Sequence, residues 1–95
     1  MKHYIIVKWN EAITDKSSVA EKVRSLYMAA DQIEGIEHVT IKENITPRDN
    51  RYDLMIILDM SDDALQTWDD SSLHKQWKAE YSDLIEQKAI FDSVG

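Results

Sequence analysis

Two histidines are the residues of this chain best suited to proton chemistry. His74 lies in the stretch WDDSSLHKQW, six residues after Trp68 and three before Trp77, and His3 stands near the start of the chain. An imidazole titrates near pH ~6.5, so it can accept a proton and return it close to neutrality without strong tuning. Enolisation or aldol-type ring closure needs such a base next to a carbonyl, and it also needs a donor that holds the developing oxyanion.

The donor role could fall to the second histidine or to a tyrosine such as Tyr27 or Tyr52. His3 shares strand parity with Ile5, Val7 and Trp9, so all four should face the same layer. His74 begins the helical stretch that carries Trp77 and Tyr81. We therefore expect the two histidines to approach one another in a cleft between the sheet and the helices.

These residues also have a purely structural interpretation. A histidine near a helix start often bonds only backbone or water, and one at the beginning of a strand often lies at the edge of the protein. Trp68, Trp77 and Tyr81 are more typical of core packing than of a ligand stack. His38 falls in an alternating strand pattern, which favours a structural or exposed position.

Neither a metal nor a cofactor is expected. Metal binding by His3 and His74 would need a third ligand, and the sequence offers none. Aspartates gather in DMSDDALQTWDD, residues 59–70. Two of them lie where a helix should start, and the helix dipole alone favours an acid there.

Composition limits the possible partners and locations. The chain has 95 residues, enough for one small domain spanning residues 1–95, and a formal net charge of −7. Nucleic acids and anionic membranes call for a basic surface, so neither is expected as a partner. The chain has no cysteine and no apolar run near the ~20 residues that span a membrane. A cytoplasmic protein is the default expectation.

Hydrophobic spacing predicts four strands and three helical segments. Strands are expected over residues 3–9, 36–45, 52–60 and 87–94. A helix is expected over residues 14–33, with Ser18 and Glu21 as a capping box and Gly35 as its stop. A short helix should run from Ser61 to about residue 69. A further helical face carries Leu73, Trp77, Tyr81, Leu84 and Ile85.

The resulting order, β-α-β-β-α-β with the second α split in two, is the ferredoxin-like signature. It predicts an α+β domain with a four-stranded antiparallel sheet and helices on one face. In the third strand Tyr52, Leu54, Ile56 and Leu58 point one way, yet Met55 and Ile57 on the other side are apolar too. Both faces of the central strands therefore need burial, and we predict a homodimer through the open sheet face. An interface of ~1,600 Å² would help so small a core considerably.

The chain also resembles the stress-responsive A/B barrel domain (Dabb, dimeric α/β-barrel) family from residue 3 to residue 92. The landmarks are Lys2-His3 before an apolar strand that ends at Trp9, Tyr52-Asp53 before the third strand, Trp68, His74, Trp77, and the closing Ile90-Phe91-Asp92. The resemblance implies a ferredoxin-like protomer whose sheet joins that of a second copy to form a barrel. It also implies a pocket lined by Tyr27, Tyr52, Leu54, Trp68 and Trp77.

The best-defined enzymes of that family are plant polyketide cyclases, which close an aromatic ring without a cofactor. Their catalytic histidine corresponds to His74, whereas their catalytic tyrosine falls on Trp68 and a further histidine falls on Leu54. Tyr27 lies within one residue of a pocket tyrosine of those enzymes. Because tryptophan has no hydroxyl, the cyclase activity itself does not transfer. His3 and His74 are the two positions at which this chain keeps a histidine of the family pattern.

Two functions remain open from the sequence. The first is a cofactor-free enzyme acting on a small, hydrophobic carbonyl compound by proton transfer at His74, with a cofactor-independent monooxygenase of the same barrel superfamily as a variant. The second is a non-catalytic homodimeric binding module, related to stress, that holds a small ligand or none. Trp68 and Leu54, at positions where the cyclases have catalytic groups, favour the second.

Overall fold

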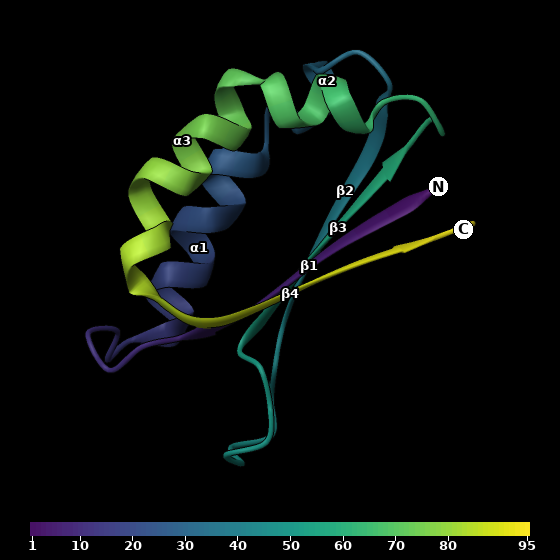
Figure 1. Ribbon diagram of the computed structural model, residues 1–95. Helices are drawn as coiled ribbons and strands as arrows, with labels where there is room; N and C mark the ends of the chain where they lie inside the picture. The colour runs from purple at the N-terminus through teal and green to yellow at the C-terminus, as the bar shows by residue number, and fades with distance from the viewer.

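A computed structural model describes residues 1–95 and has a four-stranded antiparallel sheet in the order β2-β3-β1-β4, with all helices on one face (Figure 1). The strands are β1 (Lys2–Trp9), β2 (Ile36–Glu43), β3 (Leu54–Met60) and β4 (Ile85–Ser93). The helices are α1 (Lys16–Tyr27), α2 (Leu65–Asp70) and α3 (Ser72–Tyr81), with single 3-10 turns η1 (Ala30–Gln32) and η2 (Ser82–Leu84). The predicted ferredoxin-like architecture is confirmed.

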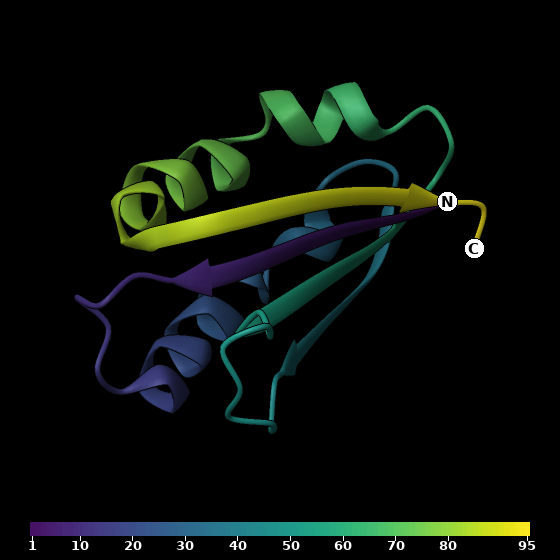
Figure 2. The ribbon, with the colours of Figure 1, turned by 60° about the horizontal axis from the view of Figure 1, so that its bottom comes forward.

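Two interleaved β-α-β units build the sheet. β1 and β3 lie at its centre and pair with each other, while β2 and β4 form its edges. Figure 2 shows α2 and α3 running beside β4. None of the helices combines the length and the apolar character needed to cross a lipid bilayer.

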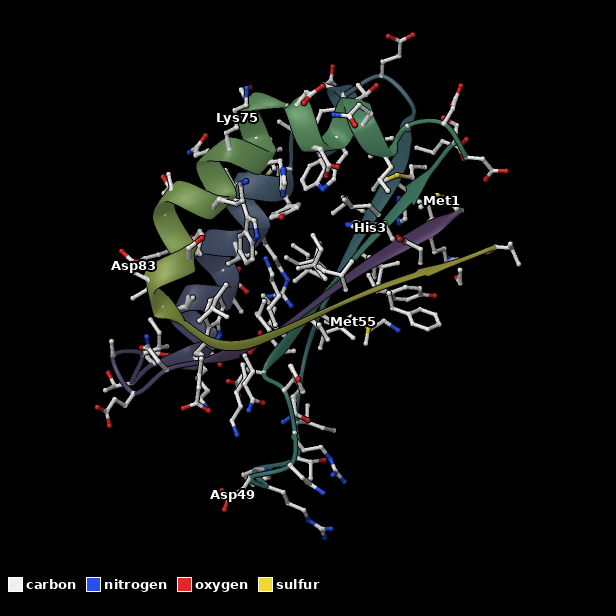
Figure 3. All side chains as sticks on the ribbon, viewed as in Figure 1. Met1, His3, Asp49, Met55, Lys75 and Asp83 are labelled. Atoms are coloured by element: carbon white, nitrogen blue, oxygen red, sulfur yellow. The ribbon has the colours of Figure 1, made fainter.

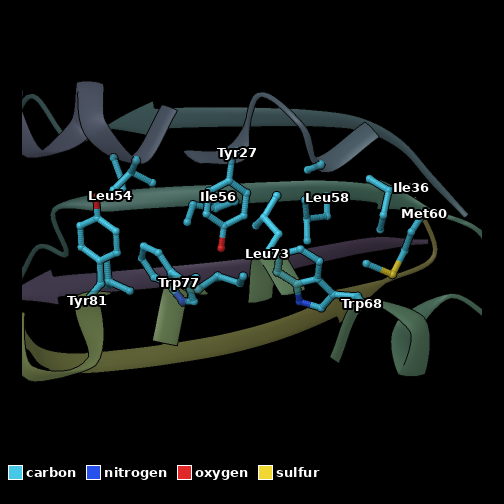
Figure 4. Close-up of a cluster of buried hydrophobic side chains, with 14 of the residues drawn as sticks. Tyr27, Ile36, Leu54, Ile56, Leu58, Met60, Trp68, Leu73, Trp77 and Tyr81 are labelled. Atoms are coloured by element: carbon cyan, nitrogen blue, oxygen red, sulfur yellow. The ribbon is translucent and has the colours of Figure 1, made fainter. Parts of the chain in front are cut away.

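The helix side of the sheet forms the core. Along β1 and β3 alternate residues are buried, as the strand period of two requires, and those of β3 are Leu54, Ile56, Leu58 and Met60. Helix residues including Tyr27, Trp68 and Trp77 close over them (Figure 4). His3 is the one polar residue among the buried set, with 6 % of its surface exposed.

The opposite face of the sheet carries no helix and is also apolar at its centre. Tyr4 pairs with Ile57 on one side and with Phe91 on the other, and Ile6 pairs with Met55. Met55 lies on this open face, whereas His3 lies on the helix side (Figure 3). The prediction that both faces of the central strands are apolar is confirmed.

The first helix differs from its prediction at both ends. Its N-cap is Asp15, whose side chain accepts a hydrogen bond from the backbone N–H of Ser18 at 3.0 Å, so the expected capping box of Ser18 and Glu21 is wrong. It ends at Tyr27 rather than at residue 33, because the chain turns through η1 toward β2. Gly35 has a φ of +88°, and a Cβ there would lie 2.6 Å from the Cβ of Ala64.

The other element boundaries shift by a few residues. β2 ends at Glu43, two residues early, and β4 begins at Ile85, which the helical pattern had included. β3 starts at Leu54 rather than Tyr52. Just before it, the Asp53 carboxylate accepts from the Trp9 N–H at 2.8 Å and from Lys16 Nζ at 2.9 Å. α2 starts at Leu65 rather than Ser61, since Ser61 to Ala64 form a separate turn.

Candidate functional site

A cavity of about 340 Å³ lies between the α2–α3 segment and the β1–β4 pair, and both His3 and His74 line it. The expected approach of the two histidines is therefore present in the fold. Ile5 and Ile90 from the strands and Leu65 and Trp77 from the helices supply apolar wall. A pocket with an apolar lining and a few convergent polar groups is typical of small-molecule sites.

The position of His3 follows from strand register. His3 pairs with Asp92 across β1 and β4, and both side chains lie on the helix face. His3 Nδ1 lies 2.5 Å from Asp92 Oδ1. The Asp92 carboxylate thereby fixes the orientation of the buried His3 ring. It can also balance a positive charge on that ring.

The position of His74 follows from the start of α3. Ser71 caps this helix, and its Oγ accepts a hydrogen bond from the His74 backbone N–H at 3.1 Å. His74 Nδ1 lies 3.1 Å from the backbone carbonyl oxygen of Asp69. The Trp68 ring packs on the other side, with ring centroids 5.1 Å apart. The first contact fixes the backbone of His74, and the other two hold its imidazole in one place.

The hydrogen-bond partners determine which ring nitrogen of His74 carries the proton. A carbonyl oxygen can only accept, so Nδ1 must donate to Asp69. In the neutral ring Nε2 then holds the lone pair and can act as a base. The same logic gives His3 a protonated Nδ1 facing the Asp92 carboxylate. No protein group bonds Nε2 in either ring.

The residues expected to line the pocket separate into groups. Trp77 lines the cavity with the two histidines. Trp68 is fully buried behind His74 and does not line this cavity. Tyr52 and Leu54 border a different hollow, beside Ile6 and Met55. The structure thus brings His3, His74 and Trp77 together and places the rest elsewhere.

Tyr27, a candidate donor, is also absent from this cavity. Its ring packs between Trp68 and Trp77, at centroid distances of 5.8 and 5.7 Å (Figure 4). Its hydroxyl is buried without a hydrogen-bond partner. Burial, followed by the nearby Tyr81, raises the pKa of Tyr27 well above the ordinary 10.0 of a tyrosine. The phenol keeps its proton near neutrality, but it cannot donate to a ligand in this cavity because it does not line it.

Sequence reasoning missed four charged residues of the site, all of which line the cavity: Asp69, Lys78, Lys88 and Asp92. Strand alternation was the available signal, because Lys88, Ile90 and Asp92 follow at intervals of two on one face of β4. Lys78 follows His74 by one helical turn. No group of three or more potential ligands that could hold a metal ion occurs in the chain.

Comparison with known proteins identifies the family. The family model of the Stress Responsive A/B Barrel Domain matches residues 1–94. The chain belongs to the Dabb family. A search among curated proteins finds no match.

Solved structures similar to this Dabb protein show the same fold. A dimeric ferredoxin-like protein of unknown function from Thermobifida fusca superposes with a TM-score of 0.78 at 17% identity, over 95% of this chain and 85% of its own. A dimeric protein of unknown function with a ferredoxin-like fold from Bacteroides fragilis has a TM-score of 0.80 at 14% identity, over 97% of this chain and 92% of its own. A hydroxynitrile lyase from Passiflora edulis has a TM-score of 0.73 at 10% identity, over 95% of this chain and 87% of its own.

Proposed function

We propose that this Dabb protein is a cofactor-free enzyme that moves a proton next to the carbonyl of a small, hydrophobic compound bound between α3 and β4. The observation that carries the proposal is the presence of two imidazoles in one cavity, each with Nδ1 bonded to an acceptor and Nε2 without a protein partner. His74 is the base and His3 is the donor to the oxyanion.

The proposed step is enolisation. His74 Nε2 takes a proton from the carbon next to the carbonyl. The C–H electron pair forms a C=C bond, and the carbonyl π pair moves to oxygen. Because Asp92 can balance a positive charge on His3, His3 can hold a second proton on Nε2 and donate a hydrogen bond from it to that oxyanion. Return of the proton from His74 to the enolate restores both partners, so no oxidant or other co-reactant is required.

We also propose that the protein is a homodimer joined through the open sheet face and that it works in the cytoplasm. The apolar patch of Tyr4, Ile6, Met55, Ile57 and Phe91 supports the dimer, since 61 % of Phe91 is exposed in the single chain. The two relatives described as dimeric have the same fold. The absence of cysteine is consistent with a reducing compartment.

A direct test uses methyl 4-acetylbenzoate in D₂O, because deuterium enters the acetyl methyl group only through the enolate. We expect the protein to accelerate exchange, followed by NMR, by about 10²-fold or more over buffer, a typical general-base contribution. His74→Ala should remove most of this acceleration. His38→Ala is the matched control, because His38 is an exposed histidine on β2 outside this cavity. Undiminished exchange in the His3→Ala, His74→Ala double variant would overturn the proposal.

A binding module is the second candidate. It is favoured by one observation: no hydroxyl-bearing residue lines the cavity, and Trp68 behind His74 has only a ring N–H. Under this alternative the ketone would shift the resonances of cavity residues such as Trp77, while exchange would stay at the rate of buffer.

A further inference from the structure

We propose that the natural ligand of this cavity carries a carboxylate at the end opposite its carbonyl, held by Lys78 and Lys88. This inference rests on the proposed function, because it takes the histidine end of the cavity as the place of the carbonyl. It adds a substrate class, namely slender keto acids with an apolar middle.

The polar groups of the cavity are separated along its length. In the strand pair, His3 lies opposite Asp92, Ile5 opposite Ile90, and Val7 opposite Lys88. The histidine end and the lysine end are thus four residues apart, about 13 Å along the strand. The apolar pair Ile5 and Ile90 lies between them.

The helix above repeats this order. α3 runs in the same direction as β1, since His74 near its start shares the cavity with His3, while Tyr81 at its end packs on Trp9 with ring centroids 5.9 Å apart. Lys78 follows His74 by four residues, about 6 Å along the helix. Lys78 and Lys88 therefore both lie on the side of the histidines nearer Trp9, one on the helix wall of the cavity and one on the strand wall.

Both ammonium groups are free to bind a ligand. Neither Lys78 nor Lys88 forms a salt bridge or a side-chain hydrogen bond, although acids outnumber bases in this chain by 18 to 11. The two acids of the cavity are at its other end, where Asp92 bonds His3 and the backbone carbonyl of Asp69 bonds His74. Two exposed cations without a protein partner, on opposite walls of a cavity whose middle is apolar, favour an anion.

The test compares two probes that differ in one charge: 4-acetylbenzoate and its methyl ester. Each has a ketone and an acid-derived group on opposite ends of one benzene ring. Binding is measured by titration calorimetry at low salt, independently of any exchange. We expect the carboxylate to bind about tenfold more tightly than the ester, the size of one charge-assisted hydrogen bond at a partly exposed site. Added salt should reduce the difference.

Variants assign the preference to the two lysines. The Lys78→Gln, Lys88→Gln double variant should bind both probes with similar affinity. Lys75→Gln, on the same helix but outside the cavity, should keep the preference. Equal affinity of the native protein for both probes, or no binding of the carboxylate at millimolar concentration, would overturn the inference.

The two proposals fail in different ways. A charge preference that depends on Lys78 and Lys88, without deuterium exchange, would support the lysine site and contradict the enzyme. Exchange of the ester that depends on His74, without a charge preference, would support the enzyme and contradict the lysine site.

Discussion

Asp92 Oδ1 lies 2.5 Å from His3 Nδ1. The two residues are 89 positions apart in sequence, yet they stand directly opposite each other in the β1–β4 register. This contact joins the two ends of the chain at the candidate site. It also gives a carboxylate to the histidine that is proposed to stabilise an oxyanion.

We predict that Asp92→Ala lowers the rate of ketone exchange by about 10- to 100-fold, the usual cost of losing a partner that orients a functional histidine. The NMR signature is the tautomer of His3: its Nδ1 proton should be observable in the native protein and lost in the variant. Asp92→Asn keeps an acceptor oxygen and should restore part of both. Asp83→Ala, which removes an exposed acid far from the cavity, should change neither; equal effects of the two alanine variants would contradict the role of Asp92.

The open sheet face should lose its ability to associate when a charge is placed at its centre. Ile57 lies on β3 between Tyr4 and Thr40, so Ile57→Glu would bury an unpaired carboxylate in the proposed interface. We expect a cost of about 3 kcal/mol or more, enough to give monomers in light scattering at tens of micromolar protein. Ile45→Glu is the control, because Ile45 is 93 % exposed on the loop before β3. A native protein that is already monomeric would contradict the dimer.

Tyr27→Phe should leave the protein as stable or make it more stable by up to about 1 kcal/mol at neutral pH. The Tyr27 hydroxyl is buried without a partner, so the native protein bears its desolvation cost without a hydrogen bond in return. Urea unfolding measures the difference. A loss above about 1 kcal/mol would mean that the hydroxyl has a partner in solution.

Alkaline pH provides a separate test of the same burial. The folded protein raises the pKa of Tyr27 above the ordinary 10.0, so above pH 10.0 the unfolded chain releases this proton while the folded one retains it. Stability is therefore full below this pH and falls above it, by about 1.4 kcal/mol per pH unit for one group. Tyr27→Phe should remove that part of the slope. Burial, then Glu80, also raises the pKa of Tyr81, which adds a contribution of the same sign.

The start of α1 gives a test at the opposite end of the molecule. Asp15→Ala should cost about 1 kcal/mol, because it removes the acceptor that caps the Ser18 N–H. Ser18→Ala should change stability by less than about 0.5 kcal/mol, since its hydroxyl has no partner. Thermal unfolding measures the stability of both variants. A larger loss of stability in Ser18→Ala than in Asp15→Ala would favour the capping box of Ser18 and Glu21 instead.

The strands and helices were predictable because their signals are local. Alternation in β1 and β3 and the spacing of three to four residues in the helices depend only on which side chains face the core. Boundaries were less predictable, since Asp15 and Ser18 are both good caps and only the packed chain selects between them. The start of β3 was equally hard to predict. Tyr52 and Asp53 fit the strand pattern, yet the Asp53 carboxylate accepts hydrogen bonds from Trp9 in β1 and from Lys16 in α1.

The sequence by itself determined the element order, the two-sided apolar sheet and the two histidines worth testing, because residue type and period carry that information. Only the tertiary structure decided which polar groups meet. Asp92 reaches His3 through strand register, Lys78 and Lys88 line one cavity from a helix and a strand, and Tyr27 and Trp68 turn into the core rather than the cavity. These are contacts between residues distant in sequence, and no local pattern encodes the register or crossing that brings them together.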